Sequence, residues 1–461
     1  MANESTEEFA RTSTEKFADF GIHPIDADVF GEDIEPRIAT LRRARRRRGE
    51  AGKVGYMSLM DTDGVLRWEL GPGPAPSRRY RRRRAGTRLA AGDRTGDVIR
   101  QFKFEELPPN EVGAKLQQLD GFLTPNQGLR EVTRQLKVGR EVAPKPGRIL
   151  LIVHGTFSHC DNLLDEITGT AEGKSLLERV FSSGKYAQVL AFNHPTLSVS
   201  PILNAAALAH HFRGSDANVD VICHSRGGLV VRWWLEVLDH AAKPRGRVVF
   251  AGPPLAGTGL AAPARLRGAL NVLTNISKTL GVISKGSMLV FPAAAPIGHA
   301  AGVMFGFFGK LMDIASRTPI VDAGVAMIPG LAGQSREGAN GEILRLRESF
   351  TGLQEADRRR RFIDNYYVLQ SNFEPPDPTW KFWRYFRKDQ LLNTAADMVF
   401  EGNNDLVVDT DSMASLADDI FNLSLAEAQV ERFGGTSEVV HHLNYFHQPQ
   451  TIRLIERALQ V

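Results

Sequence analysis

The feature that most constrains the fold of this 461-residue chain is a series of strand-length apolar runs that begins at residue 148. Helical patterns separate the runs, which cover residues 148–155, 187–193, 219–225, 247–252, 365–370 and 437–442. Continuous apolar strands that alternate with helices predict an α/β fold, in which helices cover both faces of a parallel sheet. Ligands of such sheets bind at the carboxyl ends of the strands, so the residues that follow each run are the place to look for chemistry.

The run at 219–225 leads into the sequence Cys-His-Ser-Arg-Gly-Gly at 223–228, and an apolar helical pattern follows. A nucleophile elbow has the form G-x-S-x-G on a sharp strand-to-helix turn, and here Cys223 stands in place of the first glycine. Small residues are needed there so that the strand and the helix can approach each other. The pattern predicts Ser225 as a nucleophile and the backbone N–H of Arg226 as an oxyanion donor. The alternative is a turn that merely joins a strand to a helix.

The run at 148–155 ends in His154-Gly155. Glycine lets the backbone turn so that the N–H of Thr156 or of Phe157 points toward the serine as the second oxyanion donor. His154 itself has an equally good interpretation as a structural histidine.

A serine hydroxyl becomes a good nucleophile when a histidine takes its proton and a carboxylate orients that histidine. After a nucleophile elbow, the acid and then the histidine follow along the chain. Asp405, in a Gly/Asn loop at 401–408, is the predicted acid, and Asp364, Asp409 and Asp411 are alternatives.

The segment 437–449 supplies three candidates for the base. His442 is the predicted base, His441 is the alternative and His447 ranks third. Adjacent histidines point in different directions, so we expect only one of the pair to reach Ser225.

Taken together, these motifs resemble an α/β-hydrolase of the lipase/esterase type. The matching segments are HGTF at 154–157, CHSRGG at 223–228, AGPPLAGT at 251–258, PGLAGQS at 329–335, EGNNDLVV at 401–408 and HHLNYF at 441–446. The resemblance implies a mainly parallel sheet flanked by helices, with Ser225 as nucleophile, Asp405 as acid and His442 as base. It also implies an oxyanion hole made by the backbone of Thr156 or Phe157 together with Arg226.

The expected domain organisation has four parts: an acidic segment at 1–35, an Arg-rich β-hairpin module at 36–105, a connecting helical segment at 106–146 and the hydrolase domain at 147–461. In the enzymes that the chain resembles, an insertion after the AGPPLAGT strand forms a cap, which here would cover about 258–345. An apolar cap would form an acyl pocket that excludes water, whereas a plain helical subdomain is the alternative. The uncharged stretch at 286–309 is expected to be buried or lid-like, and a membrane span is the weaker interpretation.

Charge is concentrated near the start of the chain. Residues 1–35 hold 2 basic and 10 acidic side chains, and residues 36–100 hold 18 basic and 6 acidic ones. Arginine clusters at 42–48 and 78–84 frame the expected hairpin, whose turn is at Asp63-Gly64. They could bind an anionic membrane surface or an acidic partner, or nucleic acid, for which no motif is present. A solvated arm is the alternative.

The resulting hypothesis is a serine hydrolase that cleaves carboxylic esters of apolar acyl or lipid substrates through a covalent acyl-enzyme. Amides and thioesters remain open as substrates. The alternative is a catalytically silent or narrow-specificity scaffold whose Arg-rich module is the binding surface.

No cofactor and no metal is expected, because the sequence has no phosphate-binding loop and no His/Cys cluster with ligand spacing. The two cysteines lack a CxxC pattern, and the first thirty residues do not have the pattern of a secretory signal. We therefore expect a cytoplasmic protein, with peripheral membrane association through the arginines as an open alternative.

Overall fold

The computed structural model describes a large part of the chain. The described residues are 11, 17, 22–25, 54–62, 64–71, 97–105, 111–241, 244–261, 266–286, 302–303, 328–336, 340–373, 382, 402–417, 425–434 and 440–461.

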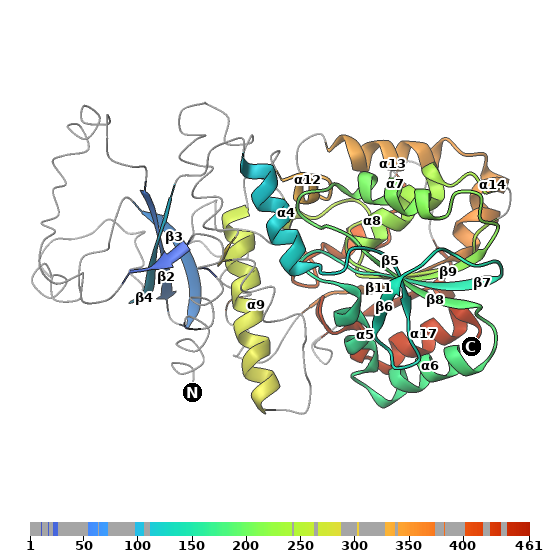
Figure 1. Cartoon of the computed structure of the whole chain (residues 1–461), viewed down its shortest axis with the longest axis horizontal. Helices are drawn as coiled ribbons and strands as arrows, with labels where there is room; N and C mark the ends of the chain where they lie inside the picture. Colours follow the sequence, from blue (N-terminus) through green and yellow to red (C-terminus); the bar gives the residue numbers. More distant parts are fainter. Residues whose placement is uncertain are drawn as a thin grey trace, which may run out of the picture.

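The larger of two sheets has the strand order β12-β11-β10-β9-β7-β8-β5-β6 (Figure 1). Its strands are β5 (Gly128–Val132), β6 (Val138–Glu141), β7 (Arg148–Val153), β8 (Gln188–Asn193), β9 (Asn218–His224), β10 (Val248–Ala251), β11 (Tyr366–Ser371) and β12 (Val430–Phe433). The pairs from β12 to β8 are all parallel, whereas β5 is antiparallel to both β8 and β6. The mainly parallel sheet confirms the α/β prediction.

Strand β7 shows why the apolar runs are continuous. Side chains of a strand alternate between the two faces of the sheet. Ile149 and Leu151 pack into one hydrophobic cluster and Leu150 and Ile152 into another, and all four are fully buried. A strand with a core on each side needs apolar residues at every position.

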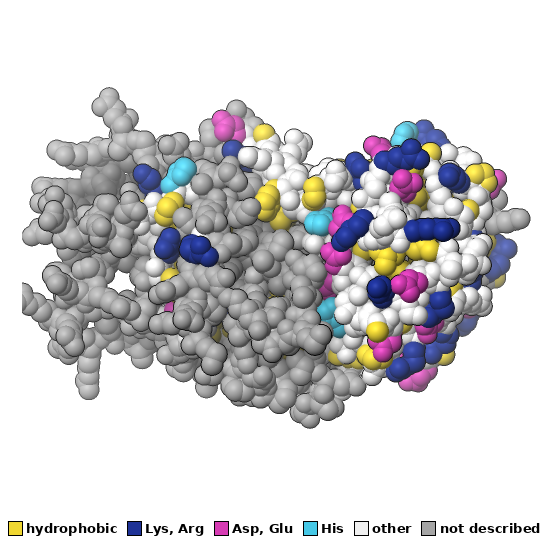
Figure 2. All heavy atoms as spheres, turned by 60° about the horizontal axis from the view of Figure 1, so that its bottom comes forward, with side chains coloured by type: hydrophobic (Ala, Val, Ile, Leu, Met, Phe, Trp, Pro, Cys, Tyr) yellow, Lys and Arg dark blue, Asp and Glu magenta, His cyan; other side chains and the backbone are white. Residues whose placement is uncertain are grey.

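Helices cover both faces of this sheet (Figure 1). On one face lie α7 (Pro201–His211), α8 (Gly227–Arg232), α13 (Gly341–Thr351) and α14 (Glu355–Arg361), and on the other lie α5 (Cys160–Thr168), α6 (Ala171–Ser182) and α17 (Pro449–Leu459). Figure 2 shows cationic and anionic side chains interspersed over the part of this body that faces the viewer.

Two expectations about the main sheet are wrong. The last strand is β12 at Val430–Phe433, and residues 440–442 of the expected strand 437–442 lie in a loop. Within the expected helical segment 106–146, the described residues form one α-helix, α4 (Val112–Leu123), whereas 128–132 and 138–141 form β5 and β6 of the main sheet.

The sequence does not indicate strands β5 and β12, and the reason is physical. β12 reads VERF with only its two end residues buried, and β5 reads GLREV with two buried positions. Both lie toward the edges of the sheet, where a strand does not have a core on each side and its sequence carries no apolar run.

A second, smaller sheet lies apart from the main one and has the order β1-β4-β2-β3, with all pairs antiparallel. Its strands are β1 (Ile22–Pro24), β2 (Val54–Thr62), β3 (Val65–Gly71) and β4 (Asp97–Glu105). β2 and β3 are the arms of the expected hairpin. At its turn Gly64 has φ +88°, and its N–H donates to Asp61 Oδ1 over 2.6 Å. The arginine clusters at 42–48 and 78–84 lie outside the described residues.

Helix α9 (Leu266–Gly286) lies between the small sheet and the main body (Figure 1). Asn275 pairs with both backbone groups of Leu66, through Oδ1 at 2.9 Å and Nδ2 at 2.7 Å, and Asn271 Oδ1 accepts the N–H of Trp68 at 2.8 Å. β3 is an edge strand of the small sheet, and an edge strand presents unpaired backbone groups. The two asparagines therefore complete the hydrogen bonding of that edge.

No helix within the described ranges is long and apolar enough to cross a bilayer. The uncharged stretch at 286–309 lies almost entirely outside them.

Candidate active site

Ser225 occupies a strained turn between β9 and α8. Its backbone has φ +54°, in the left-handed region that side chains other than glycine rarely adopt. The turn is held by backbone hydrogen bonds, in which the N–H of Ser225 donates to Ala251 O over 2.8 Å and the N–H of Gly228 donates to Ser225 O over 2.9 Å. The serine is thereby fixed at the carboxyl end of the sheet.

The positions two before and two after Ser225 differ in the size of the side chain that they can hold. A Cβ at Gly227 would lie 2.7 Å from His154 O and 2.8 Å from Val153 O, so glycine is required there. Cys223 is fully buried in the core, and its Sγ lies 3.5 Å from Val249 O. Its side chain belongs to the same hydrophobic cluster as Leu229 and Val230 of α8, so this position holds a small side chain between the strand and the helix.

Asp405 and His442 form a buried pair. His442 Nδ1 lies 2.7 Å from Asp405 Oδ2, and Oδ1 of the same carboxyl accepts the N–H groups of Val407 at 3.0 Å and Val408 at 2.8 Å. Burial opposes ionisation of Asp405, yet the adjacent His442 and these hydrogen bonds together lower its pKa below the ordinary value. The carboxyl is therefore ionised and orients the imidazole.

Tyr445 is a further partner of this carboxylate that the sequence analysis missed. Its hydroxyl donates to Asp405 Oδ2 over 2.8 Å, and burial raises the pKa of the phenol well above its ordinary value. The only sequence signal is that a buried tyrosine needs a partner for its hydroxyl, which does not identify that partner.

The alternatives considered for the acid and the base lie elsewhere. His441 Nδ1 accepts the N–H of Leu443 at 3.2 Å, and burial lowers its pKa to about 3. Asp409 pairs with Arg336 at 3.2 Å, and Asp364 lies before β11, at the far end of that strand from the site. Of the alternatives ranked lower, His447 lies in the 3-10 turn Tyr445–His447 and Asp411 in the short helix α16 (Thr410–Met413).

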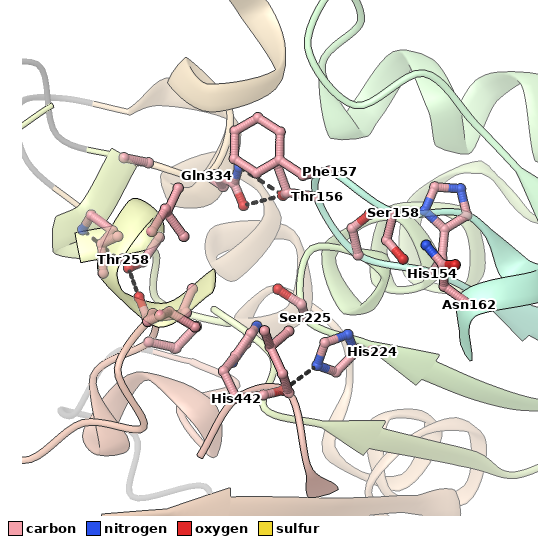
Figure 3. Close-up of a pocket in the computed structure, with 18 of the residues that line it drawn as sticks. His154, Thr156, Phe157, Ser158, Asn162, His224, Ser225, Thr258, Gln334 and His442 are labelled. Atoms are coloured by element: carbon pink, nitrogen blue, oxygen red, sulfur yellow. Dashed lines mark hydrogen bonds between the residues drawn. The ribbon is translucent and has the colours of Figure 1, made fainter. Parts of the chain in front are cut away.

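His442 and Ser225 line the same pocket and lie beside each other (Figure 3). His442 Nε2 is buried and has no hydrogen-bond partner among the described residues. In the neutral tautomer in which Nδ1–H donates to the carboxylate, Nε2 is the nitrogen that can accept a proton.

The loop after β7 is organised by His154. Its Nε2 accepts the N–H of His194 at 3.1 Å, so Nδ1 carries the proton and donates to Gly155 O over 2.8 Å. Burial lowers the pKa of His154 to about 3, which keeps it neutral. His154 is thus a structural histidine. The C=O of Gly155 and the N–H of Thr156 belong to one trans peptide and point in opposite directions. The hydrogen bond from His154 to Gly155 O therefore turns the N–H of Thr156 away from His154.

The two predicted donors in this loop are not equivalent. The N–H of Phe157 donates to Thr196 Oγ1 over 3.3 Å. The described part of the chain provides no acceptor for the N–H of Thr156 or of Arg226. The loop also lies close to the serine, since a Cβ at Gly155 would be 2.7 Å from Ser225 Cβ.

One wall of the pocket is apolar and comes from α9. Ala269, Leu270, Leu273 and Ile276 of this helix line it, and Leu260 and Leu331 extend it. In the same pocket the Gln334 side chain hydrogen-bonds the Thr156 hydroxyl (Figure 3).

The described residues contain no group of three or more His, Cys, Asp or Glu side chains that could hold a metal ion.

A mainly parallel sheet flanked by helices, with a serine in a strained turn at the carboxyl end of a strand, defines the α/β-hydrolase fold. The chain belongs to a family described as "Domain of unknown function (DUF7379)", whose model matches residues 115–460. A search of curated proteins finds no match.

Solved structures with similar folds include lipase 1 from Pelosinus fermentans, which is 13% identical with a TM-score of 0.36 and covers 68% of this chain and 98% of its own. Naproxen esterase from Bacillus subtilis is 14% identical with a TM-score of 0.32, and the match covers 77% of this chain and 99% of the esterase. A haloalkane dehalogenase from Agrobacterium tumefaciens is 13% identical with a TM-score of 0.32, and the match covers 69% of this chain and 90% of the dehalogenase. The named activities of these proteins differ from one another.

Proposed function

We propose that this protein is a serine hydrolase that cleaves carboxylic esters, with Ser225 as nucleophile, His442 as general base and Asp405 as the residue that orients His442. One observation carries the proposal. His442 is bound to a buried carboxylate at 2.7 Å through Nδ1, and in the pocket that holds Ser225 no described residue hydrogen-bonds its other nitrogen.

The reaction follows from these positions. Ser225 Oγ attacks the ester carbonyl while its proton passes to His442 Nε2, and Asp405 stabilises the imidazolium that forms. Collapse of the tetrahedral intermediate breaks the bond to the alcohol, which takes that proton from His442. Water then attacks the acyl-enzyme with His442 again as base, and this second step restores the Ser225 hydroxyl.

Thr156 and Arg226 are the proposed oxyanion donors. The N–H of Phe157 already donates to Thr196, whereas those of Thr156 and Arg226 have no acceptor in the described part of the chain. Preorganised backbone donors of this kind stabilise the charge that develops on the carbonyl oxygen.

An apolar acyl group is the proposed occupant of the pocket, because every described side chain that α9 contributes to the lining is apolar. In this proposal α9 is part of the cap that the insertion at about 258–345 forms. Such a wall excludes water, so water does not compete for the hydrogen bonds at the reacting carbonyl.

The test combines a fluorophosphonate probe with turnover of p-nitrophenyl esters over a series of chain lengths. We expect the wild type to be labelled and to hydrolyse esters, and Ser225→Ala to lose both. Ser158→Ala, which removes another hydroxyl from the same pocket, is expected to keep the label. Labelling that persists in Ser225→Ala would show that the nucleophile is wrong.

A further inference from the structure

Two polar side chains of α5 face the candidate active site. Asn162 and Glu166 are four residues apart, so they lie on the same side of the helix. Both line the pocket of Ser225, and their side chains are enclosed, since the residues are 7% and 6% exposed.

Neither side chain is satisfied by the described protein. Asn162 Nδ2 is buried without a hydrogen-bond partner among the described residues. The Glu166 side chain lines the pocket, and its electrostatics are set by burial without a hydrogen bond from a described residue. Burial raises the pKa of Glu166 well above its ordinary value, which favours the neutral carboxyl, a form that can donate as well as accept a hydrogen bond. Buried polar groups are almost always hydrogen-bonded, and leaving them unpaired destabilises the folded chain. A bound molecule would supply the missing partners.

The position of this pair relative to Ser225 divides the pocket. Figure 3 shows Asn162 beside His154, on the opposite side of Ser225 from Thr258 and Gln334. The α9 side of the pocket is apolar, whereas the α5 side presents an amide N–H group and a carboxylic acid. A substrate that spans Ser225 therefore meets two different environments.

We propose that Asn162 and Glu166 form a hydrogen-bonding subsite for a neutral oxygen-bearing group of the substrate, a hydroxyl or a carbonyl. This inference rests on the proposed function. It narrows the substrate class from plain apolar esters to esters in which an apolar part lies against α9 and a hydroxyl or carbonyl group reaches α5. The amide of Asn162 donates to this oxygen, and the Glu166 carboxyl donates to it or accepts from it.

The experiment compares kcat/KM for matched esters that differ by a single oxygen. One panel is p-nitrophenyl hexanoate against its hydroxy- and oxo-hexanoates at each chain position, and the other is hexyl butyrate against hydroxyhexyl butyrates. We expect the wild type to prefer at least one oxygenated ester by about tenfold or more, since an unfilled polar site penalises the analogue that lacks the group.

The variants separate binding from structure. Glu166→Gln, which keeps a neutral hydrogen-bonding group, is expected to retain the preference, whereas Glu166→Met and Asn162→Leu are expected to abolish it. Glu166→Met is also expected to raise the midpoint of thermal unfolding, because it removes an unpaired buried group. A structural carboxyl would produce the opposite shift. Asp165→Asn, on the exposed face of the same helix, is the matched control and should leave the preference unchanged.

The outcomes distinguish the two proposals. If fluorophosphonate labels Ser225 and plain esters are cleaved as well as every oxygenated one, the serine hydrolase stands and the subsite is wrong. A preference that survives in both Glu166→Met and Asn162→Leu also overturns the subsite. If neither labelling nor turnover occurs, the proposed function itself fails, and this inference fails with it.

Discussion

The two walls of the pocket are built in different ways. Ser225 and the His154 loop are attached directly to strand ends, and backbone hydrogen bonds such as Ser225 N to Ala251 O fix their geometry. The α9 wall contacts the small sheet through side chains: the helix shares a hydrophobic cluster with the sheet, and its Asn271 and Asn275 hydrogen-bond the backbone of β3. The contrast indicates that the proposed reacting groups are held by backbone hydrogen bonds of the sheet, whereas the surface proposed to hold the acyl group is held by side-chain contacts. Reactivity and substrate affinity should therefore be separable by mutation.

The largest expected effect is a loss of kcat, and it comes from residues on the wall that is attached to the strand ends. Ser225→Ala and His442→Ala should each lower kcat by at least about 10⁴-fold, because nucleophile and base act as one unit. For the same reason the double variant should be no slower than either single one, as measured by initial rates on a p-nitrophenyl ester. Additive losses would contradict the shared mechanism.

Acid should destabilise this wall in particular. Burial lowers the pKa values of His154, His224 and His441 to about 3. The unfolded chain therefore binds more protons than the folded one between about pH 6.5 and 3, so the free energy of unfolding falls as pH falls through that window. Each histidine contributes about 1.4 kcal/mol per pH unit. Urea unfolding at pH 7.5 and 5.5 measures the change, and equal stability at both would refute it.

Asn275→Ala tests the other wall. It leaves the N–H and C=O of Leu66 unpaired, at a cost of about 2–6 kcal/mol for two buried groups. We expect looser α9 packing, with a KM for hexanoate esters raised several-fold and little change in kcat. Steady-state kinetics separate the two constants, and a loss confined to kcat would show that α9 also positions the reacting groups.

Tyr445→Phe should give the smallest effect. It removes one hydrogen bond to Asp405 Oδ2 and leaves the bond to His442, so we expect kcat to fall about twofold with KM unchanged. The acidic limb of the kcat profile should move as well, because the carboxylate loses a stabilising donor. An unchanged rate and profile would assign Tyr445 a packing role only.

Much of the site was predictable because it is local in the chain. The strand, serine and helix of the elbow lie within fifteen residues, and the need for glycine at Gly227 follows from how closely strand and helix approach. The apolar runs predicted the central strands, since a strand with a core on each face is apolar throughout. The strands β5 and β12, which lie toward the edges of the sheet, carry no such signal.

The remaining choices depended on contacts between residues far apart in the sequence. Whether His441 or His442 meets Asp405 depends on how the final loop folds across the sheet, and the answer is a contact over 37 residues. Thr196 takes the N–H of Phe157, and Asn275 reaches Leu66 from 209 residues away. The sequence by itself determined the chemistry of the residues and the local turns that display them. Tertiary structure alone decided which donor faces which acceptor, because hydrogen bonds require contact and the fold sets the distances.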